Sequence, residues 1–340
     1  MTPRALGFLS SVVFLLASLT SGYAQTSVTT DPVGFTAVTI TPAVDANTPR
    51  CTVVSIPFHT AATFSGAMTS VDGSNSFSCS SAGWTASQFT TTPNLVRIKG
   101  GSQTGRYFLV TANTATQITV NAGAYNLTTI LSGTDSFEVV PANTFASLFG
   151  TGSSSTPAVP FQIGNTANTA DNLMLWNGVS WDAYFNNGTN WKCSGATLSQ
   201  NNSIIYPDEA IFIIRRSTNT LSLTFQGTIP TTPLMTDIGG PGGVFAAHQY
   251  PVDTTLLLTG ISSLPNWKTG NTANTADNLL LWNGISWDAY YHNGTNWKAA
   301  GSTLNQNGAT ISTNSGMFIR RVSAASGSAS TLVQALPYSL

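Results

Sequence analysis

Two sets of three side chains, each an aspartate, a tyrosine and a tryptophan, have the residue types of a carbohydrate-binding surface. A sugar stacks its C–H face on an aromatic ring, while its hydroxyl groups pair with planar acceptors and donors. Alternate residues of a strand point to one face, which brings an aspartate and a tyrosine two positions apart together. The alternative is a packing contact between strands, worth about 0.5–1 kcal/mol per pair. The predicted ligand-binding residues are Asp182, Tyr184 and Trp191 in one set and Asp288, Tyr290 and Trp297 in the other.

Residues for catalysis and for metal binding are scarce. Hydrolysis of a glycosidic bond uses two carboxyl groups that face each other across a cleft, yet the only glutamates are Glu138 and Glu209. The three histidines are scattered without the spacing of a zinc site. The stretch from Asn165 to Asp171 and its twin each carry one carboxylate, whereas calcium sites concentrate several within about 12 residues. We therefore predict no catalytic residues, no metal and no cofactor. A hydrolase built from distant carboxylates is the alternative.

The candidate residues lie in a near-duplicate of 29 residues, Gly164–Lys192 and Gly270–Lys298, whose copies differ at four positions. Six of the eight tryptophans lie in these two blocks. Repetition of this kind indicates an architecture of stacked units. We expect each unit to continue beyond the block for about 70 residues in all, ending in a strand that carries two arginines. Those arginine pairs, Arg215-Arg216 and Arg320-Arg321, are predicted to be solubilising charges beside an apolar strand.

Asparagine-glycine pairs predict how each block folds. Asn177-Gly178 and Asn187-Gly188 are each flanked by strand-like residues, which is the sequence signal of a two-residue type I′ hairpin. Two such turns ten residues apart predict a three-stranded meander. The first turn would place Trp176 opposite Val179, and the second would place Tyr184 opposite Trp191.

The alternation of side chains divides the meander into two faces. Trp176 and Trp181 share one face with Met174 and Val179, which become Leu280 and Ile285 in the second copy, apolar exchanges of the kind that a packed core tolerates. We expect this face to be the core. The opposite face, which carries Tyr184 and Trp191, is expected to meet solvent or a ligand.

Composition narrows the classes of function. Only 7% of the residues are charged and the net charge is −1, which gives no electrostatic basis for binding nucleic acid. The hydrophobic share of 41% supplies material for a large core, so we expect a folded chain.

Residues 1–24 have the basic start, apolar run and small residues of a secretory signal peptide. No later segment predicts a membrane-spanning helix. Of the three cysteines, Cys51 and Cys79 could pair after export, which leaves Cys193 without a partner.

The fold class expected from these patterns is all-β, with antiparallel sandwich or meander units and an internal duplication in the C-terminal half. Thr, Val and Phe alternate in short runs bounded by Gly, Pro and Asn, and helix signals are few. The predicted division is a signal peptide at 1–24, an N-terminal β domain at 25–150, a linker at 151–157, a first repeat unit at 158–233, a connecting segment at 234–265 and a second repeat unit at 266–340.

Several segments resemble a family of uncharacterised surface proteins of Verrucomicrobia that carry signal peptides. The resemblance rests on TTDPVGFTAVTI (29–40), VVSIPFH (53–59), WTASQF (84–89), GRYFLVTANTATQITV (105–120), DSFEVVPANTFASLF (135–149) and the LLLW, NGTNWK and FIRR segments. It implies export and a largely β architecture, and it carries no activity or site residues. The near-identical duplicated tryptophan block departs from the family pattern.

Taken together, these features predict a secreted or surface-displayed protein without catalytic activity. Adhesion, envelope structure or the binding of an extracellular glycan are the expected roles, and polysaccharide or other surface proteins are the expected partners. The alternative function is a polysaccharide-degrading hydrolase that uses Asp and Glu as acid and base.

Overall fold

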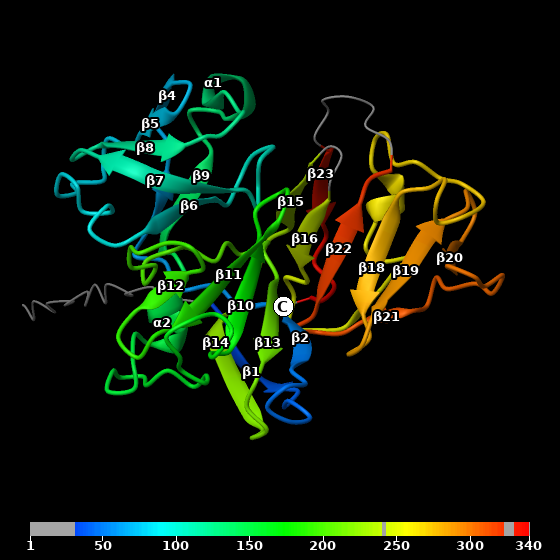
Figure 1. Cartoon of the computed structure of the whole chain (residues 1–340). Helices are drawn as coiled ribbons and strands as arrows, with labels where there is room; N and C mark the ends of the chain where they lie inside the picture. Colours follow the sequence, from blue (N-terminus) through cyan, green and yellow to red (C-terminus); the bar gives the residue numbers. More distant parts are fainter. Residues whose placement is uncertain (1–30, 240–242, 323–329, 340) are drawn as a thin grey trace, which may run out of the picture. The chain divides into compact units, whose positions relative to one another are not determined.

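The structure is a computed structural model that describes residues 31–239, 243–322 and 330–339. The predicted signal peptide at 1–24 lies outside the described residues. The predicted all-β fold is confirmed, because the strand pairs described are antiparallel and the helices are single turns (Figure 1). In the described part of the chain, no helix has the length and hydropathy needed to cross a membrane. The helices are α1 (Leu127–Ile130), α2 (Phe145–Phe149) and the 3-10 turn η1 (Ile261–Ser263).

The first repeat unit is built on a five-stranded sheet with the order β12-β11-β10-β13-β2. A separate two-stranded ribbon of β1 and β14 packs on it through a shared hydrophobic core. The sheet strands are β2 (Arg50–Val54), β10 (Asn172–Trp176), β11 (Trp181–Asn186), β12 (Trp191–Cys193) and β13 (Ile211–Arg215). The ribbon strands are β1 (Val33–Ile40) and β14 (Leu221–Thr228).

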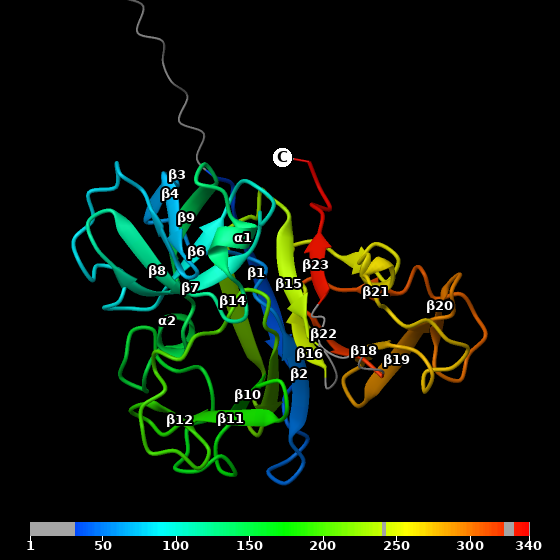
Figure 2. The same cartoon turned by 90° about the horizontal axis from the view of Figure 1, so that it is seen from above.

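The second repeat unit has the same plan. Its five-stranded sheet has the order β16-β22-β18-β19-β20, and its ribbon pairs β15 with β23 (Figure 2). A short pair of β17 and β21 is added. The strands are β15 (Leu234–Ile238), β16 (Val244–Ala247), β17 (Thr254–Thr255), β18 (Asn278–Trp282), β19 (Trp287–His292), β20 (Trp297–Ala299), β21 (Thr310–Ile311), β22 (Gly316–Arg320) and β23 (Ser330–Gln334).

A seven-stranded sheet with the order β3-β9-β6-β7-β8-β5-β4 occupies the chain between β2 and β10. It is inserted into the first unit, because β1 and β2 precede it in sequence yet pair with β14 and β13. It has a hydrophobic core of its own. The strands are β3 (Phe64–Ala67), β4 (Ser70–Gly73), β5 (Ser76–Ser78), β6 (Asn94–Ile98), β7 (Tyr107–Asn113), β8 (Gln117–Asn121) and β9 (Ser136–Pro141).

Strand pairing therefore differs from two of the predicted boundaries. The first strands of the predicted domain at 25–150 belong to the first repeat unit, and the predicted connecting segment at 234–265 supplies β15 and β16 of the second. The predicted linker at 151–157 packs against the β11–β12 hairpin, where the Asn186 side chain donates to the carbonyl oxygen of Thr151 at 2.9 Å. Long-range pairing of this kind leaves no local mark in a sequence.

The two Asn-Gly hairpins have four-residue loops, so the predicted two-residue turns are wrong. Trp176 lies directly opposite Trp181, and residues 177–180 form the loop between them. The Asn177 side-chain oxygen accepts the backbone N–H groups of Val179 and Ser180, at 3.0 and 2.8 Å. This side chain satisfies the loop amides and selects the longer turn over type I′. The predicted meander of three strands is confirmed.

The predicted division of the meander into two faces is correct, but the predicted core face is wrong. Leu173 lies opposite Tyr184 on one face, and Trp176 lies opposite Trp181 on the other. The face of Leu173, Tyr184 and Trp191 contains the central core, because α2 and the β1–β14 ribbon cover it. The face of Trp176 and Trp181 is half-buried and packs against the second unit.

One arginine of each pair, Arg215 and Arg321, is structural rather than solubilising, which corrects the prediction for these two residues. Arg215 forms a buried ion pair with Asp171, and Arg321 forms the equivalent pair with Asp277, with its Nε 2.7 Å from the carboxylate. Each aspartate also accepts two backbone N–H groups. Asp171 accepts those of Gln162 and Arg216, and Asp277 accepts those of Lys268 and Val322. Both carboxylates are fully buried, so the charges and hydrogen bonds compensate for lost hydration.

All three cysteines are unpaired. Cys51 lies on β2 of the first unit, whereas Cys79 lies in the core of the inserted sheet.

Candidate functional site

The two tryptophans of the predicted carbohydrate surface are inaccessible. Trp191 and Trp297 have no exposed surface. Phe145 of α2 stacks on Trp191 with ring centroids 5.0 Å apart, and the Trp191 indole donates to the Gly150 carbonyl oxygen at 2.7 Å. A sugar needs an open ring face to stack on, so the prediction that these rings form a ligand platform is wrong.

The other predicted ligand residues support the hairpins. The Asp182 carboxylate accepts the Asn177 side-chain amide at 3.1 Å, and Asp288 accepts that of Asn283 at 2.9 Å. Tyr184 packs against Phe145 with ring centroids 4.7 Å apart, and burial raises the pKa of its hydroxyl to about 12. Burial also raises the pKa of Tyr290. The structure thus places Asp182, Tyr184, Asp288 and Tyr290 in packing and loop-bracing roles.

Aromatic rings from both units meet in one layer, which we call the aromatic layer. Trp176 and Phe318 make an edge contact with centroids 5.1 Å apart, and Trp282 and Phe212 make the same contact at 5.1 Å. The layer consists of Trp176, Trp181 and Phe212 from the first unit and Phe245, Trp282, Trp287 and Phe318 from the second.

Hydrogen bonds across the aromatic layer are also reciprocal. The Trp176 indole donates to the Gly243 carbonyl oxygen at 3.0 Å, and the Trp282 indole donates to that of Cys51 at 3.1 Å. The registers of β2 on β13 and of β16 on β22 make Cys51 and Gly243 equivalent. Contacts in which each partner repeats the role of the other define a twofold relationship. The two repeat units therefore pack as a dimer joined into one chain.

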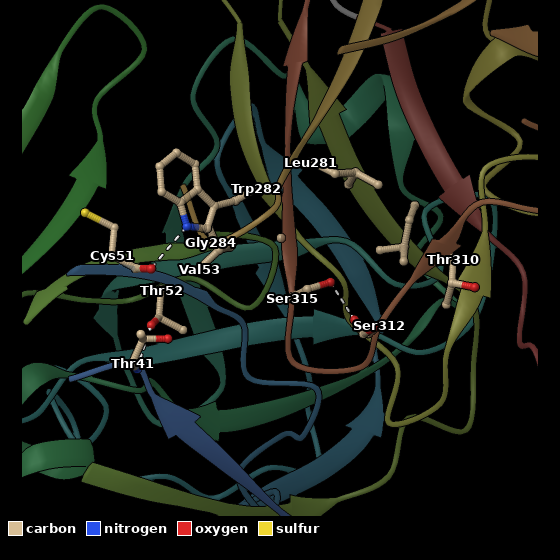
Figure 3. A pocket seen from close by; sticks show the side chains of 12 residues that line it. Thr41, Cys51, Thr52, Val53, Leu281, Trp282, Gly284, Thr310, Ser312 and Ser315 are labelled. Carbon is tan, nitrogen blue, oxygen red and sulfur yellow. Dashed lines mark hydrogen bonds between the residues drawn. The ribbon is translucent and has the colours of Figure 1, made fainter. Parts of the chain in front are cut away.

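This pseudo-twofold relationship produces two equivalent pockets, one beside each indole donor. The first, which we call the neutral pocket, has a volume of about 250 Å³. Figure 3 shows hydroxyl side chains on one side of the ring of Trp282 and the hydrogen bond from its indole to Cys51. The lining side chains with hydroxyl groups are Thr41, Thr52, Thr310, Ser312 and Ser315.

The second pocket, which we call the acidic pocket, has a volume of about 260 Å³ and lies beside Trp176. Tyr206, Asp208 and Glu209 line it. Burial raises the pKa of Glu209 to about 8 and that of Asp208 to about 6, because the charged carboxylates lose hydration. Among the described residues, neither carboxylate forms a salt bridge. Perturbed carboxyl groups in a cleft mark a candidate site.

The two pockets differ at equivalent positions just before β13 and β22. The segment YPDEA (206–210) of the first unit corresponds to STNSG (312–316) of the second. Tyr206 and Glu209 thus correspond to the two serines Ser312 and Ser315. A backbone bond confirms the equivalence, because the carbonyl oxygens of Asp208 and Asn314 accept N–H groups of the opposite unit at 2.8 and 2.9 Å. The same scaffold therefore carries an acidic and a neutral lining.

The residues of the acidic pocket were not identified as a site from the sequence, where Glu209 stands out only as one of two glutamates. The contrast between YPDEA and STNSG is the signal that could have found them. It lies outside the 29-residue blocks, and its meaning depends on strand register. Among the described residues, no group of three or more His, Cys, Asp and Glu side chains could hold a metal ion.

Comparison of this chain with models of protein families, with curated proteins and with solved structures finds no match.

Proposed function

We propose that this chain is a secreted or surface-displayed protein without catalytic activity that binds an extracellular glycan, in adhesion or in envelope structure. The observation that carries the proposal is the acidic pocket, where the rings of Trp176 and Tyr206 stand beside the carboxyl groups of Asp208 and Glu209. Export is inferred from the sequence pattern at 1–24 and from the resemblance to Verrucomicrobia surface proteins.

The lining suits a sugar in three ways. Tyr206 is 36% exposed and offers a ring for stacking on the C–H face of a pyranose. The carboxyl group of Glu209 can donate or accept a hydrogen bond near neutral pH, because its pKa is raised to about 8. The pocket is open and small, which suits one or two sugar units of a longer polymer.

The pseudo-twofold relationship indicates that these side chains serve something other than folding. The neutral pocket forms on the same scaffold with Ser312 and Ser315 in place of Tyr206 and Glu209. A half-buried carboxyl group that loses hydration without a salt-bridge partner costs stability. The first unit thus carries an unfavourable group that its twin does without, which is typical of a binding site.

Affinity electrophoresis in gels that contain soluble polysaccharides tests the proposal. The variants Tyr206→Ser and Glu209→Ser copy the residues of the neutral pocket, so they are expected to fold. Loss of one stacking contact predicts binding about tenfold weaker for Tyr206→Ser. Leu198→Ser is the control, because Leu198 is exposed and lines neither pocket. Equal retention of the wild type and both pocket variants on every polysaccharide that retards the protein would contradict the proposal.

A polysaccharide hydrolase is the second candidate, favoured by the raised pKa of both Asp208 and Glu209. A carboxyl group that stays protonated near neutral pH is the form that a general acid requires. The release of reducing ends from polysaccharides that the protein binds distinguishes the two. Release by the wild type that is lost in Glu209→Gln would favour the hydrolase.

A further inference from the structure

We propose that the neutral pocket is a second glycan-binding site, one that takes uncharged sugar units, so that each chain binds polysaccharide at two places. This inference rests on the proposed function, since both sites are taken to serve a glycan. It extends that function from one site to two sites of different charge.

The neutral pocket and the acidic pocket share one scaffold. Trp282 occupies in the neutral pocket the place that Trp176 occupies in the acidic pocket, and each indole donates to a carbonyl oxygen of the opposite unit. That hydrogen bond fixes the ring against the pocket wall. Gly284 and Gly178 are equivalent lining residues at the hairpin loops, so the two pockets share this loop, while Thr41, Thr310 and Ile311 line the neutral pocket alone.

The lining of the neutral pocket is rich in hydroxyl groups. Hydroxyl groups donate and accept hydrogen bonds, and so match the hydroxyl groups of a neutral sugar. Burial raises the pKa of the Cys51 thiol, so this side chain is neutral at physiological pH. No side chain that lines the neutral pocket is charged at that pH, which favours an uncharged ligand over an acidic or amine-bearing one. The hydroxyl-bearing side chains are Thr41, Thr52, Thr310, Ser312 and Ser315.

The neutral pocket leaves space beside the indole of Trp282. Ser312 and Ser315 are smaller than Tyr206 and Glu209 at the equivalent positions, and Gly316 replaces Ala210. The neutral pocket has a volume of about 250 Å³, close to the 260 Å³ of the acidic pocket, and the half-buried ring of Trp282 lines it. A partly open ring beside hydroxyl groups is the arrangement that a sugar stacks on.

Two sites on one chain have a consequence for binding to a polymer. Once one site holds a polysaccharide, the second meets the same chain or its neighbour at a raised effective concentration. Weak individual sites then give firm attachment, which suits an adhesive or envelope role.

Each pocket contains its own reporter, which makes a direct test available. The indole N–H signals of Trp176 and Trp282 can be followed by nuclear magnetic resonance of the full chain during titration with cellohexaose, xylohexaose and mannohexaose. We expect saturable shifts of the Trp282 signal with at least one of these uncharged hexasaccharides. Thr310→Leu adds bulk and removes a hydroxyl group at the neutral pocket, and is expected to weaken that response at least fivefold.

Matched variants separate this inference from the proposed function. Thr111→Leu makes the same exchange at an exposed position of the inserted sheet and should leave both signals unchanged. Tyr206→Ser should weaken only the Trp176 response. If Thr310→Leu fails to fold, Thr41→Leu at the rim of the neutral pocket replaces it.

The possible outcomes are distinct. A Trp176 response without any Trp282 response would overturn the second site and leave the proposed function standing. A Trp282 response that neither Thr310→Leu nor Thr41→Leu weakens would also overturn it. If no glycan shifts either signal, the proposed function fails together with this inference.

Discussion

Ala210 and Gly316 hold the same position in the two repeat units and face each other, so closely that a Cβ atom on Gly316 would lie 2.4 Å from that of Ala210. Contact between equivalent residues places them beside the pseudo-twofold axis. The absence of a side chain at one of the two positions lets the units approach.

Gly316→Ala is predicted to destabilise the fold by about 1–3 kcal/mol, because the added methyl group overlaps Ala210 and presses on Val53. Urea unfolding followed by tryptophan fluorescence measures the change. Gly308→Ala is the matched control, since nothing lies within 4 Å of a Cβ atom there. Equal stability of the two variants would show that the units do not meet at Gly316.

The two buried ion pairs are predicted to be equally important for stability. Asp171→Ala leaves the Arg215 guanidinium buried without its carboxylate, and Asp277→Ala does the same to Arg321. Loss of one partner of a buried pair costs about 3–5 kcal/mol. Chemical denaturation should show losses in this range for both variants, and little change for the exposed Asp288→Asn. A loss below about 1 kcal/mol at either aspartate would contradict the buried pair.

Trp191 and Trp297 are predicted to respond differently to the same substitution. The Trp191 indole donates to the Gly150 carbonyl oxygen, whereas the buried Trp297 indole has no hydrogen-bond partner among the described residues. Trp191→Phe loses a hydrogen bond as well as ring volume, so it should cost about 1 kcal/mol more than Trp297→Phe. Thermal unfolding of the two variants side by side measures this difference, and the reverse order would contradict the assigned hydrogen bond.

The pH dependence of stability is predicted to carry the signature of Glu209. Its pKa is about 8 in the folded protein and near 4.5 when exposed, so the folded state binds more protons between these values. Stability due to this group is present below pH 4.5 and is lost as the pH rises towards 8. Glu209→Gln stays neutral, so its melting temperature should rise relative to the wild type across this window. If the melting temperatures of the two proteins changed in parallel with pH, Glu209 would be hydrated in the folded protein.

Several features could be read from the sequence because they depend on local patterns. Alternation along each strand separated Trp176 and Trp181 from Tyr184 and Trp191, and the structure keeps that separation. The near-duplicate identified the repeat, and the Asn-Gly pairs marked both hairpin loops. The loops are longer than the Asn-Gly pairs predict, because the Asn177 side chain binds the loop amides, which a turn propensity does not include.

The choice of core face depended on partners distant in the sequence. Both faces of the meander are apolar, so the pattern alone could not determine which one α2 and the β1–β14 ribbon would cover. The pairing of β1 and β2 across the inserted sheet decided it, and thereby buried the predicted sugar-binding ring of Trp191.

The sequence by itself determined an all-β chain with a duplicated meander, because strand periodicity and repetition are properties of neighbouring residues. Only the tertiary structure decided where a ligand could bind. The acidic and neutral pockets arise where loops from one unit meet an edge strand of the other, and the register of those strands makes Glu209 the counterpart of Ser315. Such relationships follow from packing between segments distant in the sequence, 67 residues apart for Trp176 and Gly243 and 231 for Trp282 and Cys51, which no local pattern records.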